Sequence, residues 1–126
     1  MTIMRKEFDF CEGFEGEPEL TIFQKDFSGN TINSIKLWIG FFDSIIELIK
    51  PNFKDEWEGI TLYYHTHTGW YDNFLWKCEE VILFIQQLES IEKLQLNVQT
   101  QEILEILIEL LKESISSKTV IYFEYD

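Results

Sequence analysis

The chain has 126 residues, of which 23 are acidic and 10 basic, so its formal net charge is −13. This length predicts a single domain over residues 1–126, and a hydrophobic fraction of 45% suffices for a core that needs no disulfide or metal. The charge argues against nucleic acid and anionic membrane surfaces as partners, because contacts with phosphates require cations. It favours a basic protein partner, with solubility alone as the simpler explanation.

The N-terminal segment lacks the apolar stretch and cleavage site of a signal peptide, and no apolar run approaches 18 residues. Cys11 and Cys78 match no metal-binding spacing, so we expect two free, largely buried thiols. The chain has no alanine and one arginine, a usage typical of AT-rich bacterial genomes. Together these features predict a cytoplasmic bacterial protein.

Two short strands are predicted near the N-terminus. Residues 3–11 alternate, with Phe8 and Phe10 on one face, and glycines and a proline then interrupt the pattern. Residues 20–25 resume as a second strand. We expect the two strands to form a hairpin with a long turn between them, and residues 26–30 to form another turn.

Residues 31–50 are predicted to form a helix. Their polar residues recur in steps of three and four and make one narrow stripe, opposite a broad apolar face. Pro51 ends the helix. A strand through residues 35–42 is the competing prediction, because β-branched and aromatic residues dominate there. The length of the polar stripe favours the helix.

The second half of the chain predicts an interior strand at residues 60–66, which are β-branched, aromatic and nearly uncharged. Asp72 is the expected N-cap of a helix ending near Ser90, and Thr100 that of a helix over residues 101–114. Residues 119–125 form a closing strand. The order β-β-α-β-α-α-β predicts an α/β (α+β) fold with a mixed sheet of about four strands and three helices packed on it.

His65 and His67 form an H-x-H pair, and two positions apart on a strand they would project to one face. Both imidazoles would then reach one metal ion, with Asp72, Glu79 or Glu80 as a possible carboxylate ligand. The spacing is common, however, and no third ligand lies at a diagnostic distance. Two exposed or hydrogen-bonded histidines are the simpler interpretation, and no metal or other cofactor is predicted.

Trp70 and Tyr71 follow Gly69 in the predicted loop beside these histidines. Trp and Tyr are enriched at binding hot spots, although next to a glycine they also serve to pack a loop onto a core. With His65, His67 and Asp72 they form the first predicted partner-binding surface.

Residues 7–19 carry six carboxylates and no cation. Charges of one sign packed so densely repel each other, and a cationic partner would relieve that repulsion. Glu12, Glu15 and Glu17 are therefore a second candidate for partner binding, with a solvated loop as the alternative.

No catalytic motif is present. The chain has no G-x-S-x-G, no G-x-G-x-x-G and no phosphate-binding loop, and Cys78 is expected on the apolar face of a helix, where a thiol is inert. We therefore predict no catalytic residue and a protein that is not an enzyme.

In size, acidity and aromatic loops, the whole chain resembles the immunity proteins of bacterial polymorphic and contact-dependent toxin systems. That resemblance implies a protein that binds a cognate toxin domain, often a basic nuclease, and blocks its active site or an adjacent surface. No family motif is matched, so the resemblance assigns no binding residue. The alternatives are a regulatory or adaptor domain that binds another protein, a metal-dependent enzyme using His65 and His67, and a domain that binds a small ligand.

Overall fold

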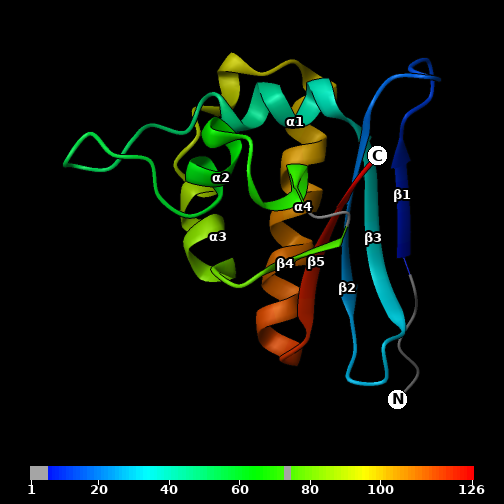
Figure 1. Cartoon of the computed structure of the whole chain (residues 1–126). Helices are drawn as coiled ribbons and strands as arrows, with labels where there is room; N and C mark the ends of the chain where they lie inside the picture. The colour runs from blue at the N-terminus through cyan, green and yellow to red at the C-terminus, as the bar shows by residue number, and fades with distance from the viewer. Residues whose placement is uncertain (1–5, 73–74) are drawn as a thin grey trace.

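The computed structural model describes residues 6–72 and 75–126. Its strands form a five-stranded mixed sheet in the order β1-β3-β2-β5-β4. Helices cover one face of this sheet, as Figure 1 shows. The predicted α+β class is confirmed, while the prediction of four strands was one too few. The strands are β1 (Lys6–Phe10), β2 (Glu19–Lys25), β3 (Thr31–Trp38), β4 (Leu75–Cys78) and β5 (Val120–Tyr125).

Four α-helices and two short 3-10 helices make up the other layer of the described chain, where three helices were predicted. None of these helices is long and apolar enough to cross a membrane. The helices are α1 (Ile39–Ile46), α2 (Ile60–Thr66), α3 (Val81–Glu89) and α4 (Val98–Ser117), with η1 (Gly69–Tyr71) and η2 (Lys93–Gln95).

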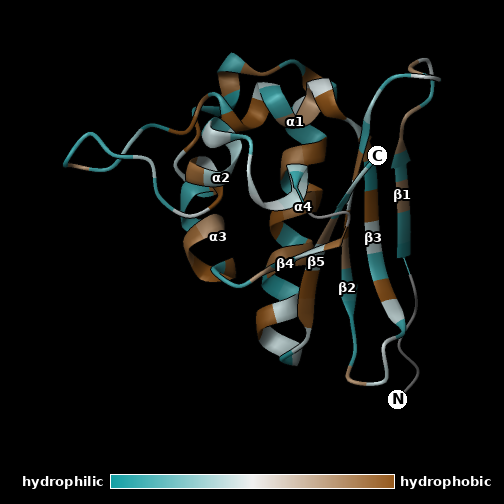
Figure 2. Ribbon diagram, viewed as in Figure 1, coloured by the Kyte–Doolittle hydropathy of each residue, from teal (hydrophilic) through white to brown (hydrophobic). Residues whose placement is uncertain are grey.

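One continuous core lies between the two layers. Hydrophobic and hydrophilic residues alternate along β3 in Figure 2, as expected for a strand with one buried face. Ile22, Ile35 and Phe123 point from the sheet into this core, and Leu107 and Leu111 meet them from α4. Burial of these side chains is the main force that holds the layers together.

The hairpin forms between β2 and β3, and the predicted pairing of the first two strands is wrong. Ile22 pairs with Ile35 in the antiparallel hairpin, whereas β1 lies on the far side of β3 and runs parallel to it. A tight turn between β2 and β3 favours this hairpin over the predicted pairing of β1 with β2. The Asp26 carboxylate stabilises the turn by accepting hydrogen bonds of 2.9 Å from the N–H groups of both Ser28 and Asn30.

Residues 31–38 form strand β3, so the predicted helix over residues 31–50 is wrong in its first half. Ile35 and Leu37 are buried, while Ser34 and Lys36 lie on the opposite face. This period of two agrees with the competing strand prediction from residue 35 to Trp38, and helix α1 begins only after it.

Residues 60–66 form helix α2, and the predicted interior strand is wrong. Ile60, Tyr63 and Tyr64 recur at positions i, i+3 and i+4 and turn one side of the helix toward the core cluster. β-branched and aromatic composition suggested a strand, but the helical spacing of these side chains allowed them to be buried together.

The helix predicted to begin at Asp72 starts only at Val81, because a short strand precedes it. Within β4, Trp76 and Cys78 lie opposite Phe123 and Ile121 of β5, which supplies the backbone hydrogen bonds. Asn73 and Phe74 of the predicted helix lie outside the described residues, as do residues 3–5 of the first predicted strand.

Helix α4 is longer than predicted, and its N-cap is Asn97. The Asn97 side chain accepts a hydrogen bond of 2.8 Å from the N–H of Thr100, the residue predicted to cap the helix. The closing strand was predicted at residues 119–125, and β5 begins one residue later and ends at the predicted position.

Both cysteines are free thiols. Cys78 is buried, on strand β4 and not on a helix, and Cys11 is half-buried. Burial raises the pKa of the Cys78 thiol to about 12, so it is protonated at neutral pH, as expected for an inert structural cysteine.

Candidate functional site

A depression opens where α1, α2, η1 and β5 meet at one end of the sheet. Its volume is about 560 Å³. It brings together three residues of the first predicted surface, His65, His67 and Tyr71, with side chains that the sequence did not single out. We call it the sheet-end depression, and its lining residues are Ile39, Asp43, Glu47, Tyr64, His65, His67, Tyr71 and Tyr125.

Two carboxylates, one on α1 and one on the residue that caps its C-terminus, share one phenol in this depression. The Tyr64 hydroxyl lies 2.8 Å from Asp43 Oδ1, to which it donates a hydrogen bond, and 3.3 Å from Glu47 Oε1. Asp43 and Glu47 are four residues apart, so both face the same side of the helix. Among the described residues that line the depression, none is a lysine or arginine.

The environment of Asp43 and Tyr64 disfavours the negatively charged form of each side chain. Burial raises the pKa of Asp43, and repulsion by Glu47 adds to the shift, while the hydrogen bond from Tyr64 and the nearby His67 oppose it. Burial also raises the pKa of Tyr64, with Asp43 contributing, so this hydroxyl keeps its proton. A cation entering the depression would meet two carboxylates that form no ion pair with a described lysine or arginine.

The two histidines, at the C-terminal end of helix α2, stack on different aromatic rings. His65 stacks on Trp57 with ring centroids 3.9 Å apart, and His67 stacks on Tyr71 with centroids 5.0 Å apart. His67 caps the helix in the left-handed conformation, with φ of 56°. The expectation that both imidazoles project from one face of a strand is therefore wrong, because these residues end a helix.

The described residues include no group of three or more His, Cys, Asp or Glu side chains arranged to hold a metal ion. His65 and His67 line one depression, but each ring has an aromatic neighbour stacked on it. The geometry thus does not point to a metal centre.

Trp70 is buried, with only 1% of its surface exposed, so it packs its loop onto the core, which was the alternative to a place on the first predicted partner-binding surface. Its ring packs edge-on against Phe42 and lies 5.1 Å from the ring of Phe123. Tyr71 follows it and reaches the depression, where burial and the charge of Asp43 raise its pKa to about 12. Asp72 is exposed and does not line the depression.

The acidic segment forms an ordered turn over residues 11–18, which we call the acidic turn. Phe14 anchors it by stacking on Trp38, with centroids 4.2 Å apart and planes within 5°. Glu12 and Glu15 line a second hollow of about 560 Å³ beside Lys36 of β3, which also forms an ion pair of 3.4 Å with Glu19. The fold thus places Lys36 beside the acidic segment, which has no basic residue of its own.

Backbone hydrogen bonds lower the pKa of Glu15, one of them from the N–H of Gly13, so this carboxylate is charged at neutral pH. Glu17 lies in the same turn and is exposed, but it does not line the hollow. The three predicted acidic residues therefore share one turn and only two of them share a hollow.

The acidic turn and the sheet-end depression lie at the same end of the sheet (Figure 1). The N–H of Ile39, which lines the depression, donates a hydrogen bond of 3.0 Å to the carbonyl of Pro18 at the end of the turn. The two predicted surfaces are thus neighbours in the fold, although about fifty residues separate them in sequence.

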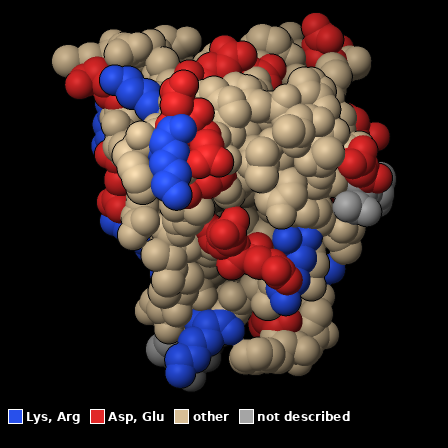
Figure 3. Space-filling view, turned by 60° about the vertical axis from the view of Figure 1, so that its left-hand side comes forward, with Lys and Arg blue, Asp and Glu red and all other residues tan. Residues whose placement is uncertain are grey.

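Negative charge is not gathered everywhere. On the face shown in Figure 3, carboxylates lie beside lysines and are separated by wide uncharged areas. Lys112 pairs with Glu89 at 3.0 Å, and Lys93 with Glu105 at 3.5 Å. Local pairing of this kind makes the sheet-end depression more distinctive, because none of the described residues that line it is a lysine or arginine.

The sequence did not point to several of the lining residues, namely Asp43, Glu47, Tyr64 and Tyr125. Asp43 and Glu47 were assigned to the solvent stripe of a helix, and their spacing of four is the only signal that they act together. Nothing in the sequence indicated that Tyr64 would face them, because that contact depends on how α2 packs on α1.

Comparison of the chain with protein-family models finds no match, and comparison with curated proteins and with solved structures finds no significant match.

Proposed function

We propose that this protein is an immunity protein, which binds a basic toxin domain and neutralises it. The observation that carries the proposal is the pair Asp43 and Glu47, two carboxylates on one phenol in an open, aromatic depression without a lining lysine or arginine. A partner that places a lysine or arginine side chain in the depression would stabilise these two carboxylates.

The depression matches the chemistry of a lysine or arginine side chain. An arginine can bond both carboxylates of such a pair, and charge-assisted hydrogen bonds are about twice as strong as neutral ones. The rings of Tyr64, Tyr71 and Tyr125 provide aromatic faces beside these carboxylates, on which a cation is further stabilised. Tyrosines also bind at low entropic cost, because they have few rotatable bonds.

The acidic turn adds negative charge near the sheet-end depression. Glu12, Glu15 and Glu17 lie at the same end of the sheet and raise the negative potential there. Such a potential accelerates encounter with a basic partner at low salt. A nuclease binds phosphates through lysines and arginines, so carboxylates that pair with those cations would block its substrate site.

Co-expression tests the proposal. A basic toxin domain, chosen from the products of genes adjacent to this one, is induced in a sensitive host with the wild-type protein, with Asp43→Asn/Glu47→Gln, or with the control Glu102→Gln/Glu109→Gln. Both variants remove two charges, but Glu102 and Glu109 are exposed on α4 and do not line the depression. We expect wild type and control to protect the cells and to copurify with the toxin, and the depression variant to do neither.

Wild-type protein that neither protects cells nor copurifies with such a toxin would end the immunity proposal. Recovery of a non-toxic partner that depends on Asp43 and Glu47 would instead favour a regulatory or adaptor protein that uses the same surface.

A further inference from the structure

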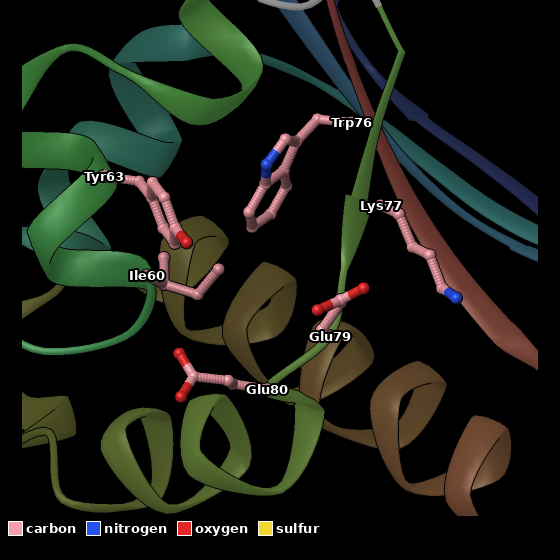
Figure 4. Close-up of a pocket in the computed structure, with 6 residues that line it drawn as sticks. All are labelled: Ile60, Tyr63, Trp76, Lys77, Glu79 and Glu80. Carbon is pink, nitrogen blue, oxygen red and sulfur yellow. The ribbon is translucent and has the colours of Figure 1, made fainter.

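A separate groove lies along strand β4, on the side away from β5 (Figure 4). Its volume is about 510 Å³. Trp76, Tyr63, Ile60 and Glu80 are directed into it, whereas the Lys77 side chain points away. We call it the β4 groove, and its lining residues are Ile60, Tyr63, Trp76, Lys77, Glu79 and Glu80.

Strand β4 is at the edge of the sheet, and among the described strands it pairs only with β5. Every second N–H and C=O group of an edge strand points away from the sheet, and these groups form a template for another extended chain. The β4 groove therefore offers backbone hydrogen bonds as well as side-chain contacts.

The side chains of the groove select a cation. The rings of Tyr63 and Trp76 meet edge to face, with centroids 5.0 Å apart and planes at 61°, and their faces form a corner. Glu79 and Glu80 are both exposed beside it, and neither forms an ion pair with another described residue. Aromatic faces and carboxylates in one hollow are the usual combination for binding ammonium and guanidinium groups.

We propose that the β4 groove binds an extended segment of a partner protein, which adds to the sheet beside β4 and places one lysine or arginine against Tyr63, Trp76, Glu79 and Glu80. The volume of the groove falls within the ordinary range for binding sites. The proposal does not depend on the immunity function, because none of these residues lines the sheet-end depression.

The register of a strand restricts the sequence of that segment further. Successive side chains of an added strand point to opposite faces of the sheet. The residues that flank the inserted cation would therefore lie on the open face, where Lys77 is exposed. Acidic residues or neutral β-branched residues fit there, whereas a second cation would be repelled.

Peptide selection tests the proposal on the full chain. Random heptapeptides displayed on phage are selected on immobilised wild-type protein, and the enriched peptide is titrated into labelled protein by NMR. We expect enriched peptides to carry one lysine or arginine between β-branched residues, and to shift the backbone amides of Leu75–Cys78 and the indole signal of Trp76.

Charge variants then test the pocket. Glu79→Gln/Glu80→Gln should weaken peptide binding by about tenfold, since it removes two ion-pair partners. The control Glu102→Gln/Glu109→Gln should leave binding unchanged. All four glutamates are exposed, and circular dichroism will show whether both variants keep the fold.

Several results would overturn the inference. These are a library that yields no peptide above an uncoated surface, enriched peptides without a basic residue, shifts located outside the β4 groove, or equal affinity for wild type and Glu79→Gln/Glu80→Gln. Concentration-dependent dimerisation that protects the amides of β4 from hydrogen exchange would also overturn it, because a second copy would then occupy the edge.

Discussion

Tyr64 donates a hydrogen bond of 2.8 Å to Asp43 and thereby joins helix α2 to helix α1 across the sheet-end depression. The contact links two residues that are 21 positions apart in the chain. It stabilises the fold by fixing α2 against α1, and it keeps Asp43 and Glu47 beside the same hydroxyl. The arrangement of the two carboxylates at this site therefore depends on one phenol.

Tyr64→Phe should lower the free energy of unfolding by about 2 kcal/mol, because hydrogen bonds to charged groups contribute roughly 1.5–3 kcal/mol. Urea denaturation at neutral pH measures the change. Tyr63→Phe is the matched control, since it removes a phenol of the same helix that makes no hydrogen bond to Asp43 or Glu47. Equal losses in the two variants would show that the bond to Asp43 adds nothing.

The raised pKa of Asp43 predicts a specific pH dependence. Burial makes the folded state bind this proton more tightly than the unfolded state, in which the pKa is near the ordinary value of 3.8. The contribution of Asp43 to stability is then fully present below pH 3.8 and is lost as the pH rises through the folded pKa. The difference in unfolding free energy between wild type and Asp43→Asn should therefore fall over that window.

Urea denaturation of wild type and Asp43→Asn between pH 3 and 7 measures this difference. The contributions of the other carboxylates to the unfolding free energy are common to both proteins and cancel. A difference that rises with pH over the same window would mean that the pKa of Asp43 is depressed. Binding of a basic partner should also weaken as the pH falls through the folded pKa, because protonated Asp43 attracts a cation less strongly.

Trp70→Ala should destabilise the protein by about 3–5 kcal/mol, the usual cost of truncating a buried aromatic side chain. Trp70→Phe should cost less, since it keeps much of the packing against Phe42 and Phe123 and removes an indole N–H that has no hydrogen-bond partner among the described residues. Thermal and urea unfolding measure both.

Trp57→Ala is the control for Trp70, because Trp57 is only half-buried and stacks on His65 at the surface. A Trp70→Ala protein with wild-type stability and a faster partner off-rate would be inconsistent with the core position of this side chain.

Zinc should not bind tightly at His65 and His67. Their rings stack on Trp57 and Tyr71, and no group of three ligands is arranged around them in the described chain. Isothermal titration of the purified protein with zinc, repeated on His65→Ala/His67→Ala, measures this. Stoichiometric binding that the double variant abolishes would revive the metal-dependent alternative.

Part of the candidate site was predictable from the sequence. His65, His67 and Tyr71 were expected near one another, because a short segment of chain holds them together whatever its conformation. Asp43 and Glu47 were not expected beside them, since only the packing of α2 on α1 brings Tyr64 within 2.8 Å of Asp43. Trp70 and Tyr71 are adjacent in sequence, and the fold buries one while the other reaches the depression.

By itself the sequence determined the α+β class, the strand at residues 20–25, the closing strand and the long amphipathic helix. The helix leaves one stripe of glutamates for water, and the two strands are short β-branched and aromatic runs bounded by polar or turn residues. Tertiary structure alone decided that residues 31–38 form a strand and residues 60–66 a helix. Both segments are rich in β-branched and aromatic residues that suit either conformation locally. The deciding energy comes from neighbours far along the chain, namely the pairing of β3 with β1 and β2 and the burial of Ile60 in the core.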